Sequence, residues 1–281
     1  MSKSAGTGDK RRKERNMKQQ EKQKQFVKPE RPIRIELFND HFQNYKRYQI
    51  PKAQLVIADI PYNVGKNAYG SNPTWYVGGD NSNGESEKAN SSFFDTDGLF
   101  RIPEYMHFCN HMLIKEPKEP GKAPAMIVFC AFDQIPMLCE YGEKYGFKHN
   151  FPLVFIKNYS AQVLKANMKI VGATEYAVVL YRDKLPKFNN DGRMIFNWFK
   201  WERDTVTPKI HPTQKPVPVL KELIRIFTDP GDVVIDPVAG SASTLRACAE
   251  CGRSCYGFEI KKDFYRLAKE KMLSTVQPEL F

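Results

Sequence analysis

The sequence predicts an α/β domain built on a mostly parallel, doubly wound sheet. Short β-branched apolar runs alternate with amphipathic helical segments along most of the 281 residues. One such run, residues 54–58, stops at an acid and a proline, a common way to deliver a side chain to the carboxyl edge of a sheet. The composition, 41% hydrophobic and 27% charged, is that of a globular protein.

The elements follow from local periodicity. Seven apolar runs predict strands at 33–38, 54–58, 125–132, 151–156, 175–181, 232–236 and 255–259. Apolar residues at helical spacing predict helices at 99–115, 134–145, 217–227, 243–251 and 263–274, with a short helical or irregular crossover at 39–50. Two segments have little periodicity: residues 63–98, which predict a loop that is functional or disordered, and the polar stretch 183–210.

Charge is concentrated at the N-terminus. Residues 1–31 hold eleven Lys or Arg and four Asp or Glu within a formal net charge of +11, and they contain almost no apolar side chains. Such a segment cannot bury a core, so we expect a disordered basic tail. Its charge suits either a polyanionic partner or simple solubility.

Several classes of protein are disfavoured. The longest nearly apolar run, residues 123–132, is about half of a membrane span, and no apolar stretch follows the basic start. We therefore expect an intracellular protein with reduced cysteines and without a membrane segment. Cys248, Cys251 and Cys255 lie close in sequence but lack a nearby His or a fourth Cys, so no metal site is predicted.

The segment 211–260 is the most informative. The predicted strand 232–236 leads into a turn of small residues, 237–242, and Ser243 can cap the helix that follows. Small residues allow a ligand to approach the backbone, and a helix start offers free N–H groups. Glu259 ends the next strand, at the spacing where an acid binds the ribose of a nucleotide-like cofactor. The pattern is neither GxGxxG nor a phosphate-binding loop with its lysine.

Two blocks together resemble the amino-directed DNA methyltransferases, the N6-adenine/N4-cytosine family. HPTQKP (211–216), DPVAGSAST (236–244) and GFEI (257–260) resemble the cofactor half of that family, and Asp59-Ile60-Pro61-Tyr62 resembles its catalytic tetrapeptide. The tetrapeptide comes first, as in the β-type order of these enzymes. The resemblance covers about residues 33–275 and implies a Rossmann-like, seven-stranded, mostly parallel methyltransferase fold with a circularly permuted motif order.

The resemblance also implies a chemistry. The lone pair of an exocyclic amine is delocalised into the base, and a carboxylate and a backbone carbonyl that accept its two hydrogens can hold the nitrogen ready for methyl transfer. Asp59 and the Ile60 carbonyl would be these acceptors, Pro61 is the third residue of the catalytic tetrapeptide, and Tyr62 would stack on a base flipped out of double-stranded DNA.

S-adenosylmethionine is the implied cofactor. Its binding residues would be Asp236, Val238, Ala239, Gly240 and Ser241 around the methionine part, Glu259 at the ribose, Thr213 and Lys215 at the carboxylate, and Asp40 at the adenine. Val238 stands where the family typically has Phe, and Ala242-Ser243 replaces Gly-Thr. These departures predict weaker cofactor binding rather than none.

The acid at position 59 favours adenine N6 as the target, by analogy with the family. The chain contains no Pro-Cys pair, which disfavours a cytosine-C5 mechanism. Two alternatives stay open: methylation of cytosine N4, and a catalytically weak nucleic-acid-binding module that retained the fold.

The resemblance divides the chain into a basic tail (1–31) and a methyltransferase domain (32–281). Within the domain, a catalytic half (33–182) carries the insertion 63–98, a target-recognition segment spans 183–210 and a cofactor half spans 211–275. DNA contacts are expected at Lys187, Arg193, Lys200 and Arg203, although a solvated loop pinned by core tryptophans fits this segment equally well. We expect a cytoplasmic, nucleoid-associated protein; a homodimer and a partner restriction nuclease stay open.

Overall fold

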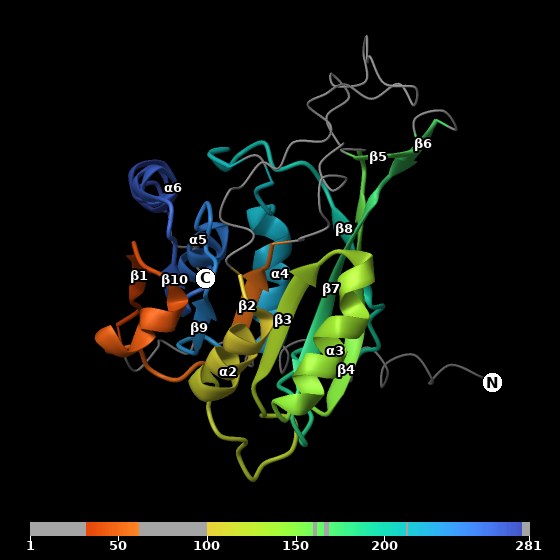
Figure 1. Ribbon diagram of the computed structural model, residues 1–281, viewed down its shortest axis with the longest axis vertical. Coiled ribbons are helices and arrows are strands. Elements are labelled where there is room, and N and C mark those ends of the chain that lie inside the picture. Colours follow the sequence, from red (N-terminus) through yellow and green to blue (C-terminus); the bar gives the residue numbers. More distant parts are fainter. Residues whose placement is uncertain (1–31, 62–99, 160–161, 166–168, 212, 277–281) are drawn as a thin grey trace, which may run out of the picture.

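The computed structural model describes residues 32–61, 100–159, 162–165, 169–211 and 213–276 (Figure 1). The predicted tail and the loop insertion lie outside these ranges, as does Tyr62. The centre of the fold is an eight-stranded sheet in the order β1-β10-β9-β2-β3-β7-β4-β8. Its strands are β1 (Ile35–Phe38), β2 (Leu55–Asp59), β3 (Ala125–Cys130), β4 (His149–Lys157), β7 (Thr174–Tyr181), β8 (Trp198–Trp201), β9 (Val233–Asp236) and β10 (Ser254–Phe258).

The sheet is mixed but mostly parallel, as predicted. Strands β1, β10, β9, β2 and β3 run parallel, β7 is antiparallel to both of its neighbours, and β8 is parallel to β4. All seven predicted strands are present. The expected strand number was wrong, because β8 adds an eighth strand beside β4. A separate two-stranded ribbon, β5 (Gln162–Lys165) and β6 (Ile170–Gly172), lies between β4 and β7 in sequence.

Helices cover both faces of the sheet. On one face lie α2 (Ile102–Met112) and α3 (Ile135–Lys144), the latter preceded by the 3-10 helix η6 (Phe132–Gln134). The opposite face carries α4 (Val217–Phe227), α5 (Ser243–Glu250) and the π-helix η7 (Ala268–Leu273), which follows α6 (Lys262–Leu267). The crossover after β1 is the 3-10 helix η1 (Phe42–Arg47). Each face has its own hydrophobic core, so the molecule is a three-layer sandwich.

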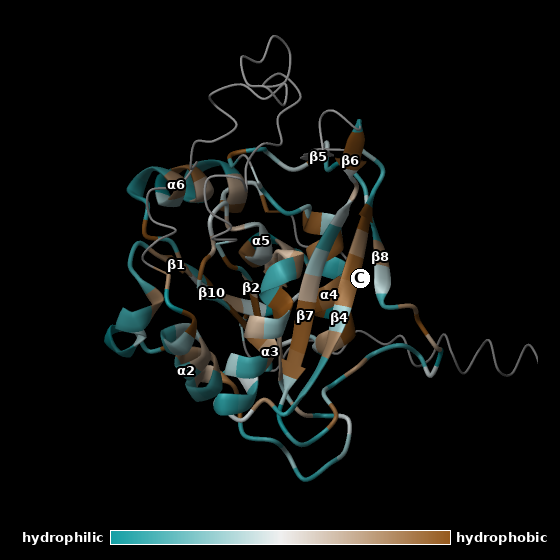
Figure 2. Cartoon of the chain, turned by 45° about the vertical axis from the view of Figure 1, so that its right-hand side comes forward, coloured by the Kyte–Doolittle hydropathy of each residue, from teal (hydrophilic) through white to brown (hydrophobic). Residues whose placement is uncertain are grey.

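The sequence pattern explains this layering. All six side chains of β3 are buried, as expected of a central strand with helices on both faces. Its neighbour β7 carries the brown colour of hydrophobic residues along its second half (Figure 2). In α4, Leu220, Leu223, Ile224 and Phe227 recur at helical spacing and are all buried. Within the described part of the chain, no helix is long and apolar enough to cross a membrane.

The strand order brings three acids to one edge. Strand β9 lies between β10 and β2, and all three run in the same direction. Asp236 is the last residue of β9, Asp59 is the last residue of β2, and Glu259 directly follows β10. In doubly wound sheets, the carboxyl edge where the chain order switches is where ligands bind. This edge is therefore the expected place of a ligand site.

Candidate functional site

The first part of the site is the end of β2. Asp59 pairs with Phe129 in the sheet register, and the Ile60 N–H donates to the Phe129 carbonyl at 3.3 Å. The Pro61 carbonyl accepts a 3.1 Å hydrogen bond from the side-chain amide of Gln134, whose oxygen in turn accepts from the Ala131 N–H at 2.9 Å. This buried glutamine ties the turn after Asp59 to the start of α3.

Lys215 joins Asp59 from the other half of the chain. Its Nζ lies 2.6 Å from Asp59 Oδ2, and the lysine side chain is only 8% exposed against 30% for the aspartate. Burial acts to lower the lysine pKa, but the carboxylates of Asp59 and Glu175 outweigh it and raise that pKa overall. The sequence predicted a role for Lys215 at the cofactor carboxylate; the structure places its ammonium on Asp59.

Asp236 occupies the neighbouring strand end. Its side chain is buried, and Oδ1 accepts a 3.1 Å hydrogen bond from the Val238 N–H. Burial raises the pKa of this carboxyl to about 7, and the charges of Asp59 and Glu259 add to the effect. A carboxyl with such a pKa is poised to ionise when a ligand supplies donors or positive charge.

The turn after Asp236 is tightly packed. Gly240 and Ala242 both have left-handed backbones, with φ of 51° and 60°. Ala242 is the position where the resemblance led us to expect Gly, and a left-handed alanine costs about 1 kcal/mol. Gly257 on β10 lies beneath the turn, where a Cβ would meet Ala239 Cβ of the turn at 3.1 Å and the Leu245 side chain of α5 at 2.6 Å. Close packing thus holds the small-residue turn against β10.

One expectation about this turn needs correction. Ser243 was predicted to cap α5, but the cap position belongs to Ala242, which makes no side-chain cap hydrogen bond. Ser243 is the first residue of the helix, and its hydroxyl hydrogen-bonds to that of Ser241 at 2.8 Å.

Glu259 connects the turn to the segment after β10. Its Oε1 accepts a 2.7 Å hydrogen bond from the Lys261 N–H, and the Gly240 backbone also donates to it. Burial nevertheless raises the pKa of this carboxyl to about 7. Among the described residues, neither Glu259 nor Asp236 forms an ion pair. The two buried acids therefore suit a ligand that brings hydroxyl or ammonium donors.

Glu259 gives the ligand-free protein a pH dependence of stability. Folding raises the pKa of its carboxyl from 4.5 to about 7, so the folded chain binds this proton more tightly than the unfolded chain. The stabilisation is therefore complete below about pH 4.5 and is lost as the pH rises through about 7. Between about pH 5 and 8, the free energy of unfolding should fall by up to about 3 kcal/mol more in wild type than in Glu259→Gln.

Denaturant unfolding at the two pH values measures this difference. Glu143→Gln, at an exposed position of α3, is the matched control and should keep the wild-type slope. An identical pH dependence in wild type and Glu259→Gln would contradict the assignment.

The remaining predicted cofactor residues lie around this edge. Asp40 follows β1 and accepts hydrogen bonds from the Asn44 amide at 2.6 Å and the Tyr48 hydroxyl at 2.9 Å. Burial acts to raise its pKa, but these hydrogen bonds lower it overall. Asp40 thus links the start of the η1 crossover to its end through these hydrogen bonds. The hydroxyl of Thr213 is exposed and lies 3.2 Å from His211 Nδ1.

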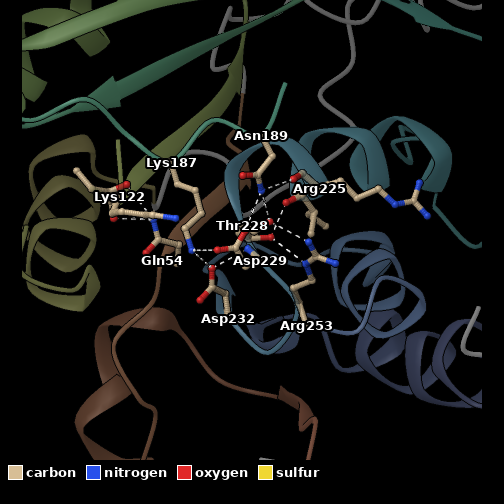
Figure 3. Close-up of polar contacts among 11 residues, drawn as sticks. Gln54, Lys122, Lys187, Asn189, Arg225, Thr228, Asp229, Asp232 and Arg253 are labelled. Carbon is tan, nitrogen blue, oxygen red and sulfur yellow. Dashed lines mark hydrogen bonds and ion pairs between the residues drawn. The ribbon is translucent and has the colours of Figure 1, made fainter. Parts of the chain in front are cut away.

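Lys187 does not suit the predicted DNA contact. Its side chain is 9% exposed, and its Nζ lies 2.8 Å from Asp229 Oδ2 and 2.7 Å from Asp232 Oδ2 (Figure 3). Asp232 directly precedes β9, so this cluster lies at the opposite edge of the sheet from Asp59. We therefore correct the prediction: Lys187 ties the chain after β7 to the segment that enters β9.

The other predicted DNA-contacting residues surround β8 and are exposed. Lys200 points outward from this edge strand, in alternation with the buried Phe199 and Trp201. Arg203 stacks on Tyr159, with 4.6 Å from its Cζ to the ring centroid. Arg193 precedes an exposed apolar run that ends in the stacked rings of Phe196 and Trp198.

Sequence reasoning missed three polar residues near the site. Gln134 was assigned only to a helix and Glu175 only to a strand, and Lys157 fell just beyond the predicted strand 151–156; Lys157 and Glu175 form an ion pair between β4 and β7. All three act through contacts across different elements, which local sequence patterns do not reveal.

Comparisons with known proteins show the family of this chain. Residues 53–270 match the N6/N4 family model described as DNA methylase. The DNA adenine methyltransferase YhdJ of Escherichia coli strain K12 is 23% identical over 264 residues, which cover 84% of this chain and 81% of YhdJ.

Solved structures share the fold. The crystal structure of the M1.HpyAVI–SAM complex matches with a TM-score of 0.58 and 20% identity, over 84% of this chain and 97% of that chain. The PvuII DNA methyltransferase, which is cytosine-N4-specific, matches with a TM-score of 0.55 and 15% identity, over 83% and 84%.

Proposed function

We propose that this chain, which belongs to the N6/N4 DNA methylase family and is an S-adenosylmethionine-dependent DNA methyltransferase, methylates the N6 amino group of adenine. The observation that carries the proposal is the meeting of Asp59 with Asp236 and Glu259 at the switch point of the sheet. An aspartate at the first position of the tetrapeptide favours adenine, and the relative YhdJ is named as an adenine methyltransferase.

Asp59 is the residue we assign to the target amine. Its ionised carboxylate accepts one N–H of the amine, and the backbone carbonyl of Ile60 accepts the other. Gln134 fixes the backbone of this turn through the Pro61 carbonyl, so both acceptors are oriented before the base arrives. Tyr62 follows directly in sequence and is assigned to stacking on the flipped base.

The two buried acids hold the cofactor. The sulfonium of S-adenosylmethionine supplies an activated methyl group. Glu259 accepts hydrogen bonds from the ribose hydroxyls, and Asp236 with the turn Val238, Ala239, Gly240 and Ser241 surrounds the methionine part. The fit rests on two desolvated carboxyls that ionise once donors reach them. Thr213 and Asp40 remain proposed contacts at the rim.

DNA is assigned to the exposed side of β8. Arg193, Lys200 and Arg203 are all exposed there, while Lys187 is withdrawn from this set. We place the protein in the cytoplasm on double-stranded DNA, with a homodimer and a partner nuclease left open.

Substitutions of Lys200 and Lys187 test which of the two lysines contacts DNA. Lys200→Ala should weaken DNA binding at all sequences and reduce the slope of the salt dependence by about one. Lys187→Met should leave DNA affinity unchanged. It should lower the free energy of unfolding by about 2 kcal/mol, because Asp229 and Asp232 lose the ammonium that they contact. Fluorescence anisotropy with a labelled duplex at several salt concentrations measures the first effect, and denaturant unfolding measures the second. Weaker DNA binding by Lys187→Met would reverse the assignment.

The proposed function is tested by following the methyl group. Purified protein is incubated with methyl-labelled S-adenosylmethionine and either unmethylated DNA, RNA or protein, and the label is counted in each acceptor. Label in DNA alone supports the proposal. Label confined to RNA or protein would overturn the choice of substrate, and no transfer, together with retained DNA binding, would favour a binding module.

A further inference from the structure

A cluster of alternating charges continues behind Asp59. The Lys215 ammonium contacts Asp59, and Glu175 is close enough to raise the pKa of that ammonium. Glu175 in turn pairs with Lys157 Nζ, and the two side chains are only 19% and 9% exposed. Two carboxylates and two ammonium groups thus balance one another in a largely buried row, which low dielectric makes strongly coupled.

Aromatic rings form the walls of this cluster. The Lys215 ammonium lies 5.4 Å from the ring centroid of Phe129 and 5.7 Å from that of Trp201, and Lys157 Nζ lies 5.3 Å from the Trp201 ring. These contacts favour ammonium groups at both positions. Gln214, next to Lys215, hydrogen-bonds to the Pro208 carbonyl at 2.9 Å and so fixes the loop that delivers the lysine.

We propose that Lys215 is a positioning residue for Asp59 rather than a ligand of the cofactor carboxylate, and that Glu175, held by Lys157, keeps the ammonium in that place. The inference rests on the proposed function of Asp59. Asp59 must be ionised to accept a hydrogen bond from an amine, and its neighbour Asp236 disfavours that charge. Lys215 supplies the opposite charge. A carboxylate accepts several hydrogen bonds, so Asp59 can keep the ammonium while it accepts from the amine.

Five other titratable groups in the described part of the chain face this pair. They are Asp236 on β9, Cys130 on β3, Glu175 on β7, Lys157 on β4 and His211 before Lys215. Burial raises the pKa of Cys130 to about 12 and lowers that of His211 to about 4, so neither titrates near neutral pH. Asp236 has a pKa of about 7 in the ligand-free protein. A shift at Asp59 is therefore measured against the titration of the neighbouring Asp236.

Three substitutions test the inference by separating kcat from cofactor binding. Lys215→Met should lower kcat at neutral pH by about tenfold or more and move the acidic limb of the kcat–pH profile upward by about one pH unit. Its Kd for S-adenosylmethionine, from calorimetry without DNA, should change by less than about threefold. Lys215→Arg should restore part of kcat, and Glu175→Gln should lower kcat in the same direction by a smaller factor.

A titration of the Asp59 carboxyl, which needs no turnover, tests the same contact with Lys215. In the ligand-free protein with ¹³C-labelled aspartate carboxyls, the signal absent from Asp59→Asn identifies Asp59. Its titration midpoint should rise by about one pH unit in Lys215→Met. Lys187→Met removes another lysine held by carboxylates and is the matched control, for which kcat, Kd and the midpoint should stay at wild-type values.

Two results would contradict the inference, and a third would contradict only the proposed function. A tenfold or larger rise of the S-adenosylmethionine Kd in Lys215→Met, with kcat at saturation unchanged, would assign the lysine to the cofactor and overturn the inference. An unshifted Asp59 midpoint would overturn it as well. An inactive wild type would contradict the proposed function alone, because the carboxyl titration would still report on the pair.

Discussion

Asp59→Ala is expected to abolish methyl transfer, with a loss of kcat of at least about 1,000-fold. The reason is that the substitution removes the only side-chain acceptor that we assign to the target amine, whereas the cofactor acids Asp236 and Glu259 remain. Product formation on unmethylated DNA at saturating S-adenosylmethionine measures the loss. Calorimetry should show cofactor binding within a few-fold of wild type.

The control for this experiment addresses folding. Removing Asp59 leaves the buried Lys215 without the carboxylate that it contacts, so stability is expected to fall. Asp59→Asn keeps the shape of the side chain and should be nearly as inactive, because it replaces an ionised acceptor by a neutral amide. Activity above about a tenth of wild type in the alanine variant would contradict the assignment of Asp59.

Glu259→Gln is expected to weaken S-adenosylmethionine binding by about 10- to 100-fold. Hydrogen bonds to a charged group contribute about 1.5–3 kcal/mol each, and glutamine offers the ribose hydroxyls one neutral oxygen in place of a carboxylate. Calorimetric titration at about pH 8, where the wild-type carboxyl is ionised, measures the difference directly.

Here Asp59→Asn is the complementary control, since it should lose activity without losing the cofactor. Wild-type affinity in Glu259→Gln would show that the acid after β10 does not hold the ribose. A melting temperature close to that of the wild type at about pH 5, where the wild-type carboxyl is also neutral, would confirm that the turn over β10 is intact.

Much of this fold could be predicted because its central strands and helices are locally encoded. Helix α4 has the bounds that its apolar spacing predicts, Val217–Phe227. Strand β8 was missed because only four residues, Trp198–Trp201, form it within a polar stretch. Their alternation of exposed and buried side chains is the signal that was available.

Local sequence patterns could not predict the side-chain contacts that form the site. Lys187 and Lys215 look alike in sequence, as lysines in polar segments next to prolines. One is held by aspartates before β9 and the other by Asp59 from the first half of the chain. Such pairings depend on which strands become neighbours in the sheet, and a single sequence does not specify this for individual lysines.

The most direct test of the central claim is the identity of the methylated base. Unmethylated double-stranded DNA is incubated with the protein and S-adenosylmethionine, digested to nucleosides and analysed by mass spectrometry, with Asp59→Ala in parallel. We predict N6-methyladenine from the wild type and none from the variant. N4-methylcytosine would keep the mechanism but contradict the choice of base, and the absence of any methylated base would contradict the account as a whole.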